Sequence, residues 1–127
     1  MLLPSEIEAR WLLPTLRALV VKRLVLEYGL TQERTAHLLG ITQASVSNYL
    51  RAVRGRAYYA GPKIQALERY ADEIASVAFD SQDPHRVVKA IQEAMDRIRQ
   101  DRTLCELHKY LEPELDVENC DICGQGQ

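Results

Sequence analysis

The sequence predicts an all-α protein, because apolar residues recur at helical spacings of three and four along much of the chain. Two stretches carry this prediction. Residues 31 to 50 contain two short helical patterns separated by a glycine. Residues 63 to 99 contain two longer patterns separated by Asp83 and Pro84. At 127 residues, the chain has room for one domain, or for one small domain with an extension.

Residues 31 to 50, TQERTAHLLGITQASVSNYL, predict two helices joined by a tight turn. Thr31 and Thr42 are of a type that caps helix N-termini. Gly40 stands where a left-handed backbone residue lets the chain turn, which is cheapest for glycine. The second helix is expected from residue 43 to about residue 51. Its inner face is predicted from apolar residues at helical spacing, namely Val46, Tyr49 and Leu50.

This pattern is typical of a helix-turn-helix. That motif needs a small residue midway along its first helix, a glycine in the turn and apolar residues inside the second helix. These places are filled by Ala36, Gly40, Ile41, Val46 and Tyr49. Residues 30 to 55, LTQERTAHLLGITQASVSNYLRAVRG, resemble the helix-turn-helix of Cro/phage-repressor-type (XRE-like) transcriptional regulators. The alternative is an ordinary helical hairpin within a bundle.

The second helix would then be the recognition helix of a DNA-binding domain. Gln43 and Asn48 carry amides that can pair with adenine, and Arg51 carries a guanidinium that suits guanine or a phosphate. The resemblance implies base contacts near the start of this helix. Arginines beyond it are expected to hold phosphates, and the alternative for each residue is a solvated polar face. The candidate DNA-binding residues are Thr42, Gln43, Ala44, Ser47, Asn48, Arg51, Arg54 and Arg56.

The charge distribution agrees with a nucleic-acid partner. Residues 1 to 63 hold nine Lys/Arg and four Asp/Glu, a net +5, while residues 64 to 127 hold seven and fourteen, a net −7. No acidic residue lies between Arg34 and Leu67. A basic N-terminal half with an acidic remainder is what a DNA-binding domain followed by a partner or sensor region would show.

Residues 61 to 102 are expected to form a helical dimerisation hairpin. Its first helix carries a narrow apolar seam of the coiled-coil kind, formed by Ile64, Leu67, Ala71, Ile74 and Ala78. The seam is either a dimer contact or the face turned to the next helix. The second helix is expected to turn inward Val87, Val88, Ile91, Met95 and Ile98. A symmetric homodimer would place two recognition helices about 34 Å apart on a palindromic operator of double-stranded DNA.

The first residues of the chain predict helices that support this motif within a DNA-binding domain of residues 1 to 60. Ser5 and Glu8 have the spacing of a capping box. Pro14 is expected to interrupt or restart the helix. A support helix follows from Thr15 to Tyr28. The loop that ends this domain is predicted from Arg54 to Pro62, because two glycines and a proline lie in it.

The three cysteines of the chain lie in the tail, residues 103 to 127, in the pattern C-x2-H-x11-C-x2-C. This pattern predicts a metal site formed by Cys105, Cys120, Cys123 and His108, with the fourth ligand open. Three chemistries fit it: a structural zinc ion, an iron–sulfur cluster, or a thiol switch of Cys120 and Cys123. The alternative is three unrelated cysteines.

The whole layout is similar to a group of predicted archaeal transcriptional regulators that combine a repressor-type helix-turn-helix with a C-terminal cysteine cluster. We favour the iron–sulfur cluster over Zn²⁺, since three thiolates would leave one iron loosely held, and such lability suits sensing. The full expectation is an all-α fold with a helix-turn-helix DNA-binding bundle, a helical dimerisation hairpin and a short Cys-rich metal-binding tail.

The predicted function is a homodimeric, sequence-specific transcriptional regulator with a redox- or metal-responsive cysteine cluster, and not an enzyme. No apolar run approaches the roughly 20 residues of a membrane span, and the start MLLPSEIEARW lacks the features of a signal peptide. We therefore expect a cytoplasmic protein without a membrane partner. Two alternatives come from other classes: a small metal or redox enzyme that uses the cysteines, and a helical protein-interaction module or antitoxin.

Overall fold

The computed structural model describes residues 2–55 and 64–114, apart from the side chains of residues 53–55 and 64. Every regular element in these ranges is helical, which confirms the all-α prediction. The helices are α1 (Pro4–Ile7), α2 (Leu13–Lys22), α3 (Gln32–Leu39), α4 (Gln43–Gly55), α5 (Ile64–Ser81), α6 (Pro84–Gln100) and α7 (Thr103–Leu111), with two π-helical turns, η1 (Glu8–Leu12) and η2 (Arg23–Glu27).

The first four elements follow one another without a break from residue 4 to residue 27, so Pro14 does not interrupt the helix. It lies in the first turn of α2, where the regular α-helix restarts, as the alternative expectation had it. The wide turn η1 ends at Leu12, and the Leu13 N–H bonds the Glu8 carbonyl five residues back. A proline lacks an N–H and its ring clashes with the carbonyl four residues earlier. A π-helical turn relieves that clash, since it shifts the hydrogen-bond register by one residue.

The predicted capping box of Ser5 and Glu8 is wrong. The helix begins at Pro4 with Leu3 as its N-cap, and the Leu3 N–H donates to the Glu6 carboxylate over 2.9 Å. Glu8 instead accepts two hydrogen bonds from Arg99, of 3.1 and 2.7 Å. The carboxylate that was expected to cap a helix therefore joins the first helix to the end of α6.

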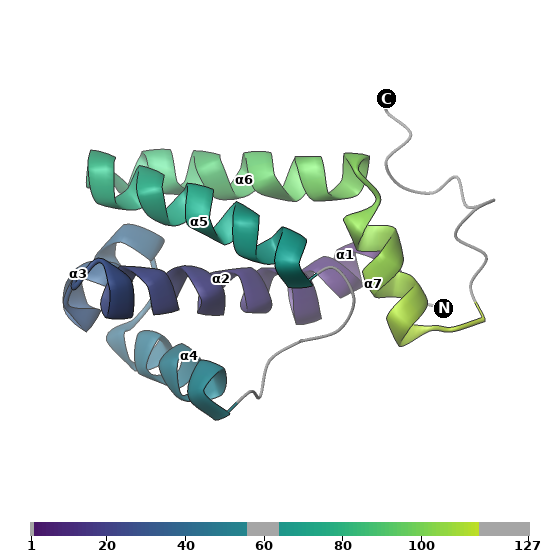
Figure 1. The fold of residues 1–127 in the computed structure, drawn as a ribbon, viewed down its shortest axis with the longest axis horizontal. Helices are drawn as coiled ribbons and strands as arrows, with labels where there is room; N and C mark the ends of the chain where they lie inside the picture. The colour runs from purple at the N-terminus through teal and green to yellow at the C-terminus, as the bar shows by residue number, and fades with distance from the viewer. Residues whose placement is uncertain (1, 56–63, 115–127) are drawn as a thin grey trace.

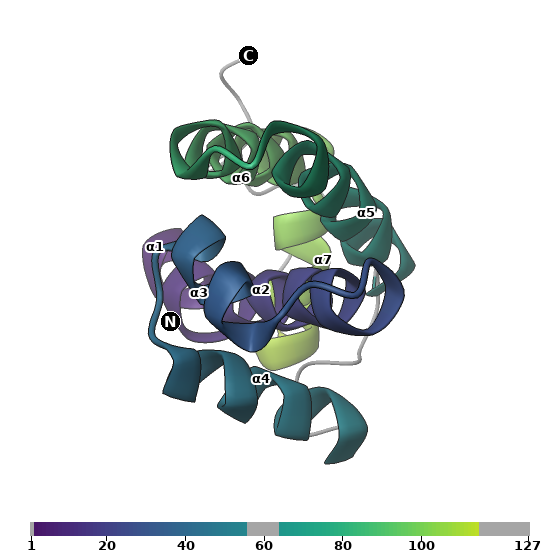
Figure 2. The same cartoon turned by 90° about the vertical axis from the view of Figure 1, so that its left-hand side faces the viewer.

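The helices are stacked in three layers, with α2 in the middle one. Figures 1 and 2 show α5 and α6 on one side of α2 and α4 on the opposite side, with α7 crossing near the N-terminal end of the first helix. Buried side chains lie around much of α2: Thr15, Leu16, Ala18, Leu19, Val20 and Val21. A helix that is apolar over most of its circumference must be covered from several sides.

One hydrophobic core joins the three regions that the sequence predicts. Its members run from Ile7 and Leu16 in the first helix, through Val46 in α4 and Ile74 in α5, to Leu107 in α7. Among the helices of the described ranges, none has the length and apolar character that crossing a membrane requires.

The apolar seam of α5 is buried inside the chain. Leu67, Ala71, Ile74 and Ala78 are each at most 1 % exposed, and α5 packs against α2 and α6. Of the two roles that the seam pattern left open, packing against neighbouring helices is the one that the structure shows. A dimer contact would need another surface.

The inner face of α6 includes Ala94 in place of the predicted Val88. Val87 and Ile98 are buried as expected, and Ile91 and Met95 are half-buried. Val88 is 60 % exposed, so its predicted inward position is wrong, and Ala94 is buried as well. A stripe of partly exposed apolar side chains therefore runs along α6 beside its buried face.

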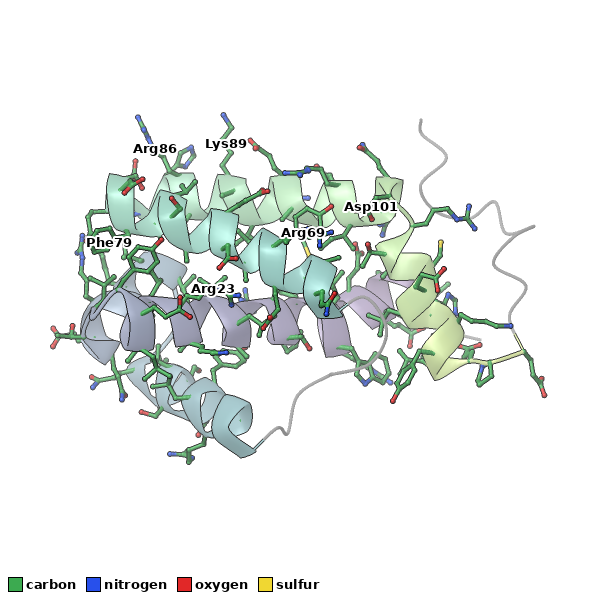
Figure 3. The ribbon with its side chains drawn as sticks, in the orientation of Figure 1. Arg23, Arg69, Phe79, Arg86, Lys89 and Asp101 are labelled. Atoms are coloured by element: carbon green, nitrogen blue, oxygen red, sulfur yellow. The ribbon has the colours of Figure 1, made fainter. Side chains whose placement is uncertain are left out.

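Two polar clusters fasten α5 to its neighbours. Arg23 lies between α2 and α5 (Figure 3), where its guanidinium pairs with Asp72 and lies 4.0 Å from Glu68. The Tyr70 hydroxyl donates to Asp101 at the corner between α6 and α7. Burial of Tyr70 and its hydrogen bond to this carboxylate raise the pKa of the phenol to about 12.

Ile74→Ala is expected to lower the free energy of unfolding by about 2–5 kcal/mol, because it removes buried methyl groups from a closed core. The loss, measured by urea denaturation, should be the same at low and high protein concentration, since the seam is packed within one chain. Val88→Ala is the exposed control and should change stability by about 0.5 kcal/mol or less. A loss that appears only at concentrations where the chain is associated would contradict this account.

Candidate nucleic-acid interface and cysteine pair

The start of α3, the turn after it and the start of α4 have the backbone that the sequence predicts. The Thr31 hydroxyl accepts a 3.0 Å hydrogen bond from the Arg34 N–H and caps α3. The Thr42 hydroxyl accepts one of 3.0 Å from the Ser45 N–H and caps α4. Between the helices, Gly40 adopts a left-handed conformation with φ of 66°. Residues 40 to 42 thus form a three-residue turn, the length common in helix-turn-helix units.

Only one side of α4 is used for packing. Val46 and Leu50 are buried, and the helix lies mainly against α2 and α3. The opposite side is exposed and includes five of the predicted DNA-binding residues: Thr42, Gln43, Ala44, Asn48 and Arg51. No residue of α4 is acidic. The helix α4 forms an outermost layer of the fold (Figures 1 and 2). Its exposed face therefore offers amide, hydroxyl, methyl and guanidinium groups, with no carboxylate from α4 among them.

Two hydrogen bonds arrange the polar groups on and beside this face. The Ser47 hydroxyl is half-buried and donates to the Gln32 side-chain oxygen at 2.6 Å, which joins the first turns of α4 and α3. The Arg51 guanidinium donates to the Asn48 side-chain oxygen within α4. Ser47 thus holds Gln32 in place, and Gln32 becomes a further polar group at the edge of the face. From the sequence, Gln32 was expected only to offer its backbone N–H to a phosphate at a helix start.

The end of α4 is longer than expected. The helix continues to Gly55, whereas the sequence predicted its end near Arg51 and a loop from Arg54 onward. The backbone of Arg54 is therefore helical. The side chain of Arg54 and all of Arg56 lie outside the part of the chain that the structure describes.

Arg34 has a structural role that the sequence pattern did not reveal. It was counted with the basic residues of the N-terminal half, but its guanidinium donates to the Gln82 side chain at 2.8 Å and to the Gln82 carbonyl at 3.2 Å. Gln82 lies in the corner between α5 and α6 with φ of 51°. This contact, between residues 48 positions apart, fastens α3 to the α5–α6 corner.

Cys105 and His108 lie on the buried side of α7, where each is 4 % exposed. Their spacing of three places both on the same helix face, as predicted. Among the described residues, the buried Nε2 atom of His108 has no hydrogen-bond partner, and it lies 3.4 Å from a carboxylate oxygen of Glu112. Glu112 also accepts a hydrogen bond from the backbone N–H of Leu2, which is the main reason that its pKa is lowered.

The other two predicted ligands, Cys120 and Cys123, lie outside the described residues. Within the described ranges, no group of three or more His, Cys, Asp or Glu side chains converges in a way that would hold a metal ion. The structure therefore places one half of the predicted metal site, the Cys105 and His108 pair.

Comparison with known proteins adds no relative to this picture. A scan against protein-family models, a search of curated proteins and a search of solved structures each found no significant match to the chain. Any function of the α3–α4 face and of the Cys105 and His108 pair therefore rests on their own residues.

Gly40→Ala is expected to destabilise the protein by about 1 kcal/mol, because a left-handed backbone is costly for a residue with a Cβ atom. Nothing lies within 4 Å of an added Cβ, so the cost comes from the backbone conformation and not from a clash. Gly40→Asn is the control, since asparagine tolerates this conformation better than alanine. Chemical denaturation of the three proteins tests this, and equal stability of Gly40→Ala and the parent protein would contradict the role of the turn.

Proposed function

We propose that the protein is a sequence-specific DNA-binding transcriptional regulator of the helix-turn-helix type, with α4 as its recognition helix. The observation that carries the proposal is the outer face of α4. It is exposed, polar and free of acidic residues, and it belongs to the outermost layer of the fold. A helix of this kind enters the major groove when nothing beside it prevents close approach.

The side chains on this face suit base and phosphate recognition. Ala44, Asn48 and Arg51 follow one another at spacings of four and three, so they lie along a single exposed stripe. In a major groove, an alanine methyl contacts thymine, an asparagine amide pairs with adenine, and an arginine pairs with guanine or a phosphate. Gln43 and the capped N-terminus of α4 at Thr42 would add contacts at the start of the helix.

The protein would act as a homodimer on a palindromic operator, because one recognition helix reads too few base pairs for a specific site. Two copies related by a twofold axis would place their α4 helices about 34 Å apart, one turn of B-DNA. The dimer surface would have to differ from the α5 seam, since that seam is buried within the chain.

Arg51→Ala is expected to weaken DNA binding and to reduce the slope of log K against log salt by about 1 if Arg51 holds a phosphate. The measurement is fluorescence anisotropy with a duplex selected from a random-sequence pool, at several salt concentrations. Arg86→Ala is the matched control. It removes one exposed arginine from α6, on the far side of the molecule from α4 (Figures 1 and 3), and should leave both values close to those of the parent protein.

Three outcomes would overturn the proposal. The first is that no duplex is enriched from the pool over successive rounds. The second is binding that salt does not weaken, which would mean that no phosphate is held. The third is an equal loss of affinity in Arg51→Ala and Arg86→Ala, which would mean that α4 is not the contacting helix.

We further propose that Cys105, Cys120, Cys123 and His108 hold a metal centre, and that an iron–sulfur cluster is a better assignment than zinc. The observation that supports a ligand here is a buried imidazole beside a buried cysteine on the same helix face, with a Glu112 carboxylate oxygen 3.4 Å from the His108 Nε2 atom. A cluster would supply redox chemistry, whereas zinc would supply only a structural tie. The part that the chain itself plays is to present a thiol and an imidazole from one rigid helix.

Protein purified without oxygen is expected to contain iron and acid-labile sulfide and to show visible absorption, all of which Cys120→Ser should reduce. His85→Ala removes an exposed histidine of α6 and serves as the control that keeps the metal content. About one zinc per chain in a colourless protein would replace the cluster by a structural zinc site. If Cys120→Ser keeps the iron and zinc content of the parent protein, the proposed metal site is wrong.

A further inference from the structure

A pocket of about 320 Å³ lies between the first helix, the end of α3 and α6. Its apolar wall is formed by Leu13, Leu39, Ile91 and Met95 together with the exposed Val88, and its polar wall by Glu8, Arg17 and Gln92. This volume is at the small end of the range for ligand sites. A single ring or a short branched chain is therefore the size of apolar group that the pocket would accommodate.

One cation in this pocket lacks a counterpart. The Nε atom of Arg17 is buried and has no hydrogen-bond partner, and no ion pair of Arg17 occurs within the described ranges. The acidic residue that lines the same pocket is Glu8, whose two carboxylate oxygens are both bonded by Arg99. A buried N–H of a guanidinium without an acceptor is costly, and a carboxylate is the group that satisfies it best.

We propose that this pocket binds a small carboxylate with an apolar body, such as a monocyclic aryl or a branched-chain carboxylic acid. Arg17 would receive the carboxylate, and Leu39, Ile91 and Met95 would enclose the apolar part. The assignment rests on the combination of an apolar wall with one cation that has no ion pair within the described residues. A neutral apolar ligand would leave the Arg17 Nε–H without an acceptor, and a highly charged one would bury its charges against leucine and methionine.

The pocket adjoins the turn that orients α4. Leu39, one of its wall residues, is the last residue of α3 and directly precedes Gly40. A ligand that packs between Leu39 and α6 would favour one arrangement of α3 relative to α6, and α3 carries α4 with it. This effect on DNA affinity rests on the proposed function, whereas ligand binding itself does not.

The test titrates benzoate, phenylacetate and 4-methylpentanoate, each with its neutral amide, into the ¹⁵N-labelled full chain without DNA. At least one acid should bind saturably, shift the amide resonances of the pocket-lining residues, and bind about tenfold or more tightly than its amide. Arg17→Gln should reduce the affinity for the acid to about that for the amide. Arg10→Gln is the matched control, because Arg10 is an exposed arginine of the same continuous helix and does not line the pocket.

The proposal is overturned if none of the acids binds saturably, if acid and amide bind equally, or if Arg17→Gln and Arg10→Gln lose the same affinity. It is also overturned if the pocket resonances shift with protein concentration alone, because a second copy of the chain would then be the occupant. If the protein binds an acid but no DNA, the pocket proposal holds and the DNA-binding proposal is wrong. If it binds DNA but none of the acids, the DNA-binding proposal holds and the pocket proposal is wrong.

Discussion

The burial of α2 is the constraint on which the rest of the structure depends. Six of its ten residues are buried, and they face more than one direction around the helix. No single neighbour can cover such a helix, so α4 must pack on one side of α2 while α5, with α6 beside it, packs on the other (Figure 2). The inner face of α4 is consumed by this packing, and only its polar face is left toward solvent. The proposed DNA-binding surface is thus a direct consequence of how the core closes.

The same packing connects the proposed reading face to the rest of the molecule. Arg34 fastens α3 to the corner of α5 and α6 through Gln82, and Leu39 lies against the pocket that α6 borders. These two contacts join α3 to the α5–α6 layer at two places. A ligand in the pocket would contact α3 at one of these two places. It could therefore favour one arrangement of α3 and α4 relative to the α5–α6 layer over another.

The sequence predicts the helices well and their partners less well, for physical reasons. Helical spacing and capping residues are local signals, so the sequence could predict the α3–α4 pair with its caps and turn at Thr31, Gly40 and Thr42. For the same reason it could predict the start of α6 at Asp83 and Pro84. Spacing does not say which partner covers an apolar stripe, so the α5 seam stayed open between a dimer and a neighbouring helix. Long-range polar contacts, such as Arg34 with Gln82 and Glu8 with Arg99, leave no local pattern at all. Nor could the sequence indicate that Arg17 lacks a partner, since that depends on the fold around it.

The most direct test of the account is a map of the surface that DNA touches. The selected duplex would be titrated into ¹⁵N-labelled protein, and the amide shifts followed residue by residue. If α4 reads DNA, the largest changes fall on residues 42 to 51, along the outer face of α4 and its capped start, with residues 84 to 100 of α6 nearly unchanged. Changes centred on α6, or a duplex that leaves the α4 resonances in place, would show that the helix proposed to read DNA does not do so.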